Sequence, residues 1–107
     1  MSWTTDQAAA EIGVERTVIV SWIEQRWVLP APAGADYSFE EVDLARLRLI
    51  HELLDELEVG EEAMPILLNL LDQLYEARHA LAELEAAIAA CPDSVRDEIQ
   101  ARIARRG

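Results

Sequence analysis

The chain has 107 residues, of which 51% are hydrophobic and 28% charged, and its net charge at pH 7 is −12. This length is typical of one domain and is too short for two independent cores. The hydrophobic content excludes wholesale disorder, and no apolar run approaches the roughly 20 residues of a membrane span. A single cysteine, Cys91, excludes an internal disulfide and a cysteine-based zinc site.

The negative charge is concentrated in the middle of the chain. Residues 36–62 contain ten carboxylates and two arginines, and all nine basic residues of the chain are arginines without a continuous basic stretch. Because Lys and Arg contacts to phosphates supply most of the affinity for nucleic acid, this distribution argues against DNA as a partner. Residues 1–6 have neither the basic flank nor the apolar run of a signal peptide, so we expect a cytoplasmic protein with no membrane partner.

Two short helices separated by a glycine turn are expected at the start of the chain. Thr4 and Gln7 fit a capping box, and residues 6–12 then form a two-turn helix that ends at Gly13. A second helix is expected over 15–26. Its apolar residues have the three-and-four spacing of one buried helix face and are Val18, Ile19, Trp22 and Ile23. Two such helices around a glycine turn are typical of a helix-turn-helix.

A small β-hairpin, or wing, is expected over 27–37, where two prolines and one glycine prevent the helix from continuing. Ser38 and Glu41 fit a second capping box, so a third helix is expected over 39–58. Its expected apolar stripe consists of Val42, Ala45, Leu49, Leu53 and Leu57, with Ile50 and Leu54 beside them.

A long fourth helix is expected over 61–90, with Pro65 confined to its first turn. Its apolar residues alternate steps of three and four over more than three heptads, which is the seam pattern of a coiled coil. The seam residues are Leu67, Leu70, Leu74, Leu81, Leu84 and Ile88. We expect this seam to join two chains as a homodimer. The alternative is packing on the third and fifth helices of the same chain.

A short fifth helix is expected over 93–105, with Val95, Ile99 and Ile103 on one side. The expected fold class is therefore all-α with a small wing hairpin. A winged helix-turn-helix head is expected over 1–59, and a long packing helix plus a short C-terminal helix over 60–107.

The order of helix, glycine turn, helix, proline-containing wing and capped helix resembles the MerR winged-helix family over residues 4–75. The capped helix carries Asp43-Leu44-Ala45-Arg46-Leu47. In that family the second helix and the wing contact DNA through arginines and tyrosines, whereas this chain has Val20-Ser21-Trp22 at the matching place. Arg16 and Arg26 are the bases of the second helix, and the wing has none. The resemblance therefore implies the MerR fold without its DNA-reading chemistry.

Within this group the sequence is similar to the chaperone-modulator family CbpM, which keeps a MerR-like head and binds a DnaJ-type co-chaperone. The residues that carry this resemblance run from Glu61-Glu62-Ala63-Met64-Pro65 to Leu71-Asp72-Gln73-Leu74-Tyr75. It implies a non-enzymatic protein that binds the J-domain of a CbpA-like co-chaperone and inhibits its cooperation with the chaperone DnaK. The alternative is a DNA-binding transcriptional regulator of the MerR family.

The resemblance also directs the choice of partner-binding residues. J-domains present a basic helix to their chaperone partner, so an acidic surface with nearby apolar anchors is expected to occupy the same patch. The expected contact residues are Trp27, Glu52, Asp55, Glu56 and Glu58. The alternative for the acidic residues is a solvated face that serves solubility. Trp22 lies on an apolar stripe and is expected in the core.

No catalytic or cofactor motif accompanies the carboxylates. The chain has no Gly-rich phosphate loop, nucleophile elbow or HExxH motif. His51 and His79 lie on different expected helices without a neighbouring set of metal ligands, and Cys91 is expected to pack at a helix end. We therefore expect no enzymatic activity, no cofactor and no metal.

Overall fold

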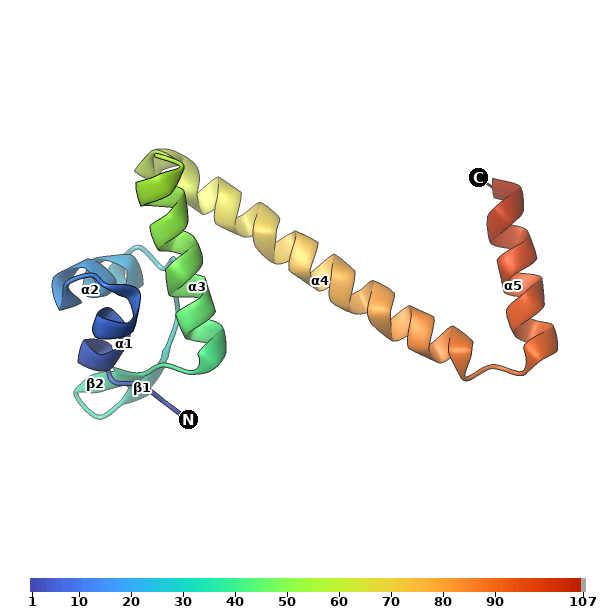
Figure 1. Ribbon diagram of the computed structural model, residues 1–107, viewed down its shortest axis with the longest axis horizontal. Coiled ribbons are helices and arrows are strands. Elements are labelled where there is room, and N and C mark those ends of the chain that lie inside the picture. The colour runs from blue at the N-terminus through green and yellow to red at the C-terminus, as the bar shows by residue number, and fades with distance from the viewer. Residues whose placement is uncertain (107) are drawn as a thin grey trace. The chain divides into compact units, whose positions relative to one another are not determined.

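The computed structural model describes residues 1–106, and it consists of helices with one small hairpin (Figure 1). In chain order the elements are α1 (Thr5–Ile12), α2 (Arg16–Glu24), β1 (Ala31–Ala33), β2 (Asp36–Ser38), α3 (Glu41–His51), a π-helical turn η1 (Glu52–Glu56), a 3-10 turn η2 (Glu61–Ala63), α4 (Met64–Ala89) and α5 (Asp93–Arg106). This confirms the expected all-α class with a wing hairpin. The chain forms two compact units, one over Met1–Leu68 and one that begins at Asn69.

Both ends of α1 follow from local sequence, as expected. The Oγ1 of Thr4 accepts a hydrogen bond from the Gln7 backbone N–H at 3.2 Å, and the Gln7 side chain accepts one from the Thr4 N–H at 2.9 Å. This reciprocal pair satisfies two N–H groups of the first turn. The helix stops at Gly13, whose φ of 85° lies in the left-handed region that glycine adopts without strain.

The second helix ends earlier than the expected range of 15–26. Arg26 adopts a φ of 64°, and the backbone N–H of Trp27 donates to the carbonyl of Trp22 at 3.0 Å. A left-handed residue followed by this hydrogen bond reverses the chain at the end of a helix. The turn therefore directs Trp27 back into the head.

The hairpin pairs β1 with β2 antiparallel, with Ala31 opposite Ser38 and Ala33 opposite Asp36. The chain stays extended beyond β2, because Phe39 exchanges two backbone hydrogen bonds of 2.8 Å with Trp3. The expected capping box at Ser38 is therefore wrong. The N-cap of α3 is Glu40, whose backbone N–H donates to the Asp43 carboxylate at 2.9 Å.

The core of the head is formed by all of its helices and by Phe39. The buried hydrophobic side chains include Ala8, Ile19, Trp22, Phe39, Leu44, Leu47, Ile50, Met64 and Leu68. The buried face of α3 differs from the expected stripe, because Val42 is 71% exposed while Leu44 is buried. Packing of α3 on α1 selects this face over the neighbouring apolar one.

The head extends beyond the expected boundary between residues 59 and 60. Met64 and Leu68, in the first turns of α4, are buried, and the compact unit ends at Leu68. Pro65 lies in the first turn of α4, as expected, where its missing N–H leaves no intrahelical bond unmade. The sequence pattern marked where the helix begins but not which of its turns the head would bury.

The second unit contains the rest of α4 and the whole of α5. The expected helices over 61–90 and 93–105 are confirmed within two or three residues. Cys91 lies at the end of α4, half-buried, with its Sγ 3.3 Å from the carbonyl oxygen of Ala87. Among residues 1–106, no helix is both long enough and apolar enough to cross a membrane.

Candidate functional site

The third helix does not continue to residue 58 as expected but widens into the π-helical turn η1. The N–H of Leu57 donates to the carbonyl of Glu52, five residues earlier, at 3.0 Å. Glu58 then adopts a φ of 52°, and the N–H of Val59 donates to the carbonyl of Leu53 at 2.8 Å. Turns of this π-helical kind are rare overall, and those that occur are often found at functional sites.

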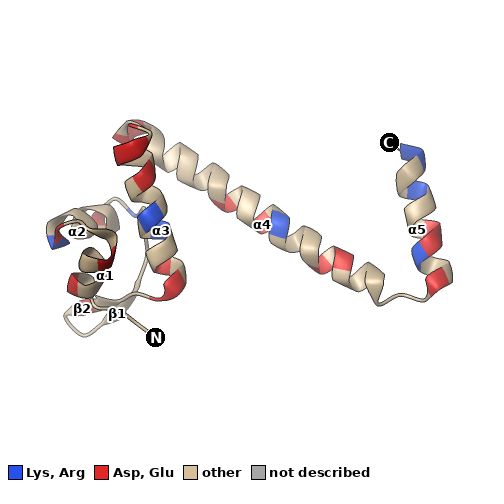
Figure 2. Ribbon diagram, viewed as in Figure 1, with Lys and Arg blue, Asp and Glu red and all other residues tan. Residues whose placement is uncertain are grey.

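This turn brings together four of the five expected partner-binding residues. Glu52, Asp55, Glu56 and Glu58 are all exposed, and Leu57, between two of them, is 68% exposed. We call these five residues the acid turn. Figure 2 shows acidic residues gathered at this end of α3. Leu53 is buried and attaches the turn to the head.

In the part of the chain that the structure describes, no arginine forms an ion pair with a carboxylate of the acid turn. His51 lies 3.8 Å from the Asp55 carboxylate, one helical turn away. Within residues 1–106, Glu52, Glu56 and Glu58 form no ion pair. The acid turn therefore presents a negative potential to any partner that approaches it.

Trp27, the fifth expected contact residue, is not on the surface, so this expectation needs correction. Its side chain is 4% exposed, and its backbone carbonyl accepts a hydrogen bond from the Arg46 Nε at 2.8 Å. The indole Nε1 finds no acceptor among the described residues. The left-handed turn at Arg26 causes this burial, and no local sequence pattern predicted the turn. Trp22 is buried as expected, at 5% exposure.

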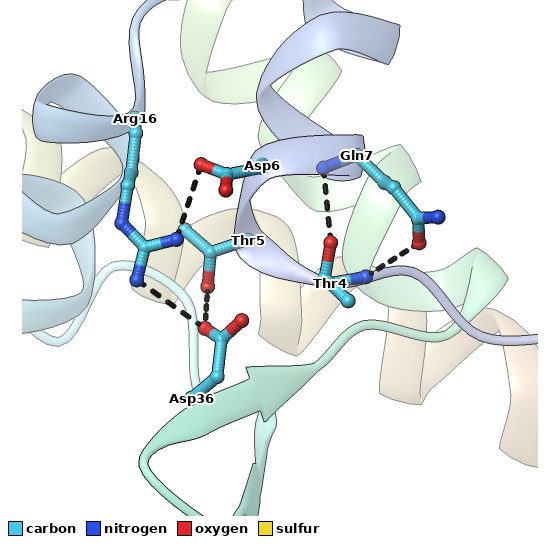
Figure 3. A network of polar contacts seen from close by, with 6 residues as sticks. All are labelled: Thr4, Thr5, Asp6, Gln7, Arg16 and Asp36. Carbon is cyan, nitrogen blue, oxygen red and sulfur yellow. Dashed lines mark hydrogen bonds and ion pairs between the residues drawn. The ribbon is translucent and has the colours of Figure 1, made fainter.

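The arginines of the head are largely engaged in contacts within the chain. Arg16 contacts two carboxylates, Asp6 at 3.1 Å and Asp36 at 3.6 Å (Figure 3). Arg48 lies 3.7 Å from Glu11, and Arg46 donates to the Trp27 carbonyl. Residues 1–68 contain four arginines, so three of them are held in place by groups of the same chain.

The carboxylate of Asp36 is the centre of this network. It accepts a hydrogen bond from the Oγ1 of Thr5, which is fully buried at the start of α1 (Figure 3). That hydrogen bond, the backbone N–H of Tyr37 and the nearby Arg16 lower the pKa of Asp36 below its ordinary value of 3.8. The network attaches the wing to the helix-turn-helix and pairs Arg16 with two carboxylates of the same chain.

The expected seam forms an exposed apolar stripe along α4. Leu70, Leu74, Leu81 and Leu84 are between 47% and 57% exposed, and Leu67 and Ile88 at the ends are half-buried. Exposed stripes of this regularity are rare on monomeric proteins, because burial of apolar surface is favourable.

Among residues 1–106, no group of three or more His, Cys, Asp or Glu side chains is arranged to hold a metal ion.

A sequence model described as MerR HTH family regulatory protein matches residues 3–59. The chain belongs to the MerR helix-turn-helix family. No curated protein and no solved structure matches it. In this MerR head, α1 and α2 form the helix-turn-helix and the hairpin β1–β2 forms the wing. The acid turn lies at the C-terminal end of the matched region.

Proposed function

We propose that this MerR-family protein is a non-enzymatic, cytoplasmic modulator that binds the J-domain of a DnaJ- or CbpA-type co-chaperone and inhibits its cooperation with DnaK. One observation carries the proposal. Three of the four arginines of residues 1–68 contact groups of the same chain, whereas the acid turn is exposed and forms no ion pair with an arginine of residues 1–106. The head therefore offers a partner negative charge in place of the positive charge that DNA requires.

Charge complementarity supports a basic helix as the ligand of the acid turn. Residues 52–62 contain six carboxylates and no base. Opposite charges on two surfaces accelerate encounter and exclude partners of the wrong sign, although they contribute less to affinity than buried apolar contacts do. A J-domain, which presents a basic helix, meets this requirement.

Leu57 supplies the apolar contact that such an interface needs. Its side chain is 68% exposed, and Leu57 stands between Glu56 and Glu58 in the sequence. Complete burial of a leucine side chain contributes about 1.5–3 kcal/mol, and contacts at the centre of an interface dominate its affinity. We infer that Leu57 is the central contact and that the carboxylates form the charged rim.

Competition is the proposed mechanism. A J-domain uses its basic helix to contact DnaK, so a protein that covers this helix prevents the contact. No chemical step is required of the modulator, which accords with the family's regulatory class.

We also propose that the protein acts as a homodimer joined by the seam on α4. Two such stripes bury each other when their side chains interdigitate as in a coiled coil. The exposed leucines at 70, 74, 81 and 84 support this part of the proposal.

Calorimetry with the J-domain encoded by the same genome tests the proposal. We expect binding that weakens as salt increases, since the rim contacts are charged. The charge reversal of Asp55→Lys with Glu56→Lys should abolish the binding heat. A matched control, Glu24→Lys with Glu85→Lys, makes the same change in net charge at exposed residues outside the acid turn and should retain it. Absence of binding at low salt would contradict the proposal.

The second candidate function is DNA-binding transcriptional regulation. The family match over residues 3–59 favours it, and so does Arg26, an exposed base at the end of α2 that forms no ion pair within residues 1–106. This function predicts an electrophoretic shift of DNA from the protein's own promoter. Failure to shift that DNA at low salt would exclude it.

A further inference from the structure

The last turns of α5 carry the charge opposite to that of the acid turn. Residues 99–106 contain Arg102, Arg105 and Arg106 and no carboxylate. Ile103 lies among these arginines and is 61% exposed. The four side chains are neighbours at the exposed end of α5. We call these four residues the arginine end.

The acid turn and the arginine end have the same kind of composition but carry opposite charges. Each places an exposed aliphatic side chain, Leu57 or Ile103, among side chains of a single sign. Arg102 has one partner within α5, Glu98 at 3.1 Å, but 72% of its side chain stays exposed. Because an apolar centre with a complementary charged rim is the usual anatomy of a specific interface, the two surfaces suit each other.

We propose that the arginine end docks on the acid turn of a second copy of this chain. This inference rests on the proposed homodimer. It assigns α5 a role in covering the surface that the J-domain is proposed to use.

The length of α4 determines which copy is within reach. A helix of 26 residues is about 39 Å long at 1.5 Å per residue. The connection 90–92, even at full extension, and the part of α5 that precedes Ile103 span at most about 25 Å together. This reach is shorter than α4 itself, so the docking is proposed with the acid turn of another chain.

Electrostatics determines the direction of pairing. A parallel dimer would place the two segments 52–62, with six carboxylates each, side by side, where they repel. An antiparallel dimer separates them and places each near the end of the partner's α4, where the partner's α5 begins. The seam fits this direction, because Leu67 then lies opposite Ile88 of the partner subunit and Leu74 opposite Leu81 of the partner subunit.

On this proposal, the arginine end controls the access of a J-domain to the acid turn. The arginine end occupies the acid turn in the free dimer, so a basic helix from a J-domain must displace it before binding. Removal of the three positive charges should therefore raise the affinity for the J-domain, by about fivefold or more if the coupling has the usual size.

Paramagnetic broadening between chains tests the docking without any J-domain. A chain that carries Cys91→Ser is labelled with ¹⁵N and mixed with unlabelled chains that bear a nitroxide on the half-buried native Cys91. We expect broadening of the amide signals of 52–62. In a second mixture the nitroxide sits on Gln100→Cys in the Cys91→Ser background, within α5, and the same signals should broaden. The triple variant Arg102→Glu, Arg105→Glu and Arg106→Glu should abolish the second effect and retain the first.

The possible results separate the claims. Broadening confined to residues near 91 would show a parallel dimer and would overturn the docking. Broadening of 52–62 from Cys91 but not from residue 100 would show an antiparallel dimer without docking, which also overturns the proposal. Absence of any broadening between chains would overturn both the docking and the homodimer. The calorimetric test of J-domain binding does not depend on any of these results. The docking proposal can therefore be contradicted while J-domain binding is confirmed, and the reverse.

Discussion

The buried hydroxyl of Thr5 donates a hydrogen bond to the carboxylate of Asp36 and so joins the first turn of α1 to the first residue of β2. Arg16, at the start of α2, reaches the same carboxylate and also Asp6 on α1. The helix-turn-helix and the wing therefore meet at one ionised group. Because hydrogen bonds to a charged acceptor are stronger than neutral ones, the position of the wing depends on the charge of Asp36.

Replacement of the Thr5 hydroxyl tests this attachment. Thr5→Val keeps the shape of the buried side chain and removes the donor to Asp36, so the urea midpoint of unfolding should fall. The control is Thr17→Val, because Thr17 is an exposed threonine on α2. Equal midpoints for the two variants would show that the hydrogen bond does not stabilise the head.

The pH dependence of stability provides a second prediction. The Thr5 hydrogen bond, the Tyr37 N–H and Arg16 lower the pKa of Asp36 in the folded chain below 3.8. A carboxyl group with a lowered pKa stabilises the fold above its unfolded value, and the contribution disappears as pH falls through the folded value. The midpoints of the native chain and of Asp36→Asn should therefore differ at pH 6 and converge below pH 3.8. A constant difference across this range would contradict the assignment.

Trp27 should behave as a core residue and not as a contact residue. Trp27→Phe removes an indole N–H that has no acceptor among the described residues, so it should change the unfolding free energy by less than about 1.5 kcal/mol. Trp27→Ala should cost about 3–5 kcal/mol. Calorimetry should find the same J-domain affinity for Trp27→Phe as for the native chain. A large loss of affinity with unchanged stability would restore Trp27 as a binding residue.

The extent of the head is tested at the start of α4. Met64 is fully buried, so Met64→Ala should lower the unfolding free energy of the head by about 2–5 kcal/mol. Ile66, two residues later, is 67% exposed, and Ile66→Ala should change it by about 0.5 kcal/mol or less. If the two substitutions had similar small effects in chemical denaturation, the head would not include the first turns of α4.

The seam is tested by the mass of the protein in solution. Leu74→Glu with Leu81→Glu places charges within the stripe and should convert a dimer to a monomer in light scattering. Gln73→Glu with Ala82→Glu adds the same charge to exposed positions outside the stripe and should leave the dimer intact. A native chain that is monomeric at micromolar concentration would contradict the proposed homodimer.

Features determined by neighbouring residues were predictable from the sequence. The capping box of Thr4 with Gln7 and the stop at Gly13 involve a few consecutive residues, and both are present as expected. Pro65 marked the first turn of α4 for the same reason. The carboxylates of the acid turn are close neighbours in the sequence, but the π-helical turn that carries them was not expected.

Features determined by pairing between distant segments were not predictable in this way. Ser38 has the chemistry of a cap, but pairing with Ala31 keeps it in the hairpin and moves the cap to Glu40. Trp27 has the composition of an interface residue, but the left-handed turn at Arg26 buries it. The apolar residues of α3 cover more than one face, and only packing on α1 decides which face is buried.

The central claim, competition for a J-domain through the acid turn, is tested most directly by the rate at which DnaK hydrolyses ATP when the J-domain stimulates it. Addition of the native protein should suppress the stimulation, and added J-domain should restore it. The variant Asp55→Lys with Glu56→Lys should not suppress it, whereas Glu24→Lys with Glu85→Lys should suppress it as the native chain does. Full stimulation in the presence of excess native protein, or equal suppression by both variants, would contradict the account.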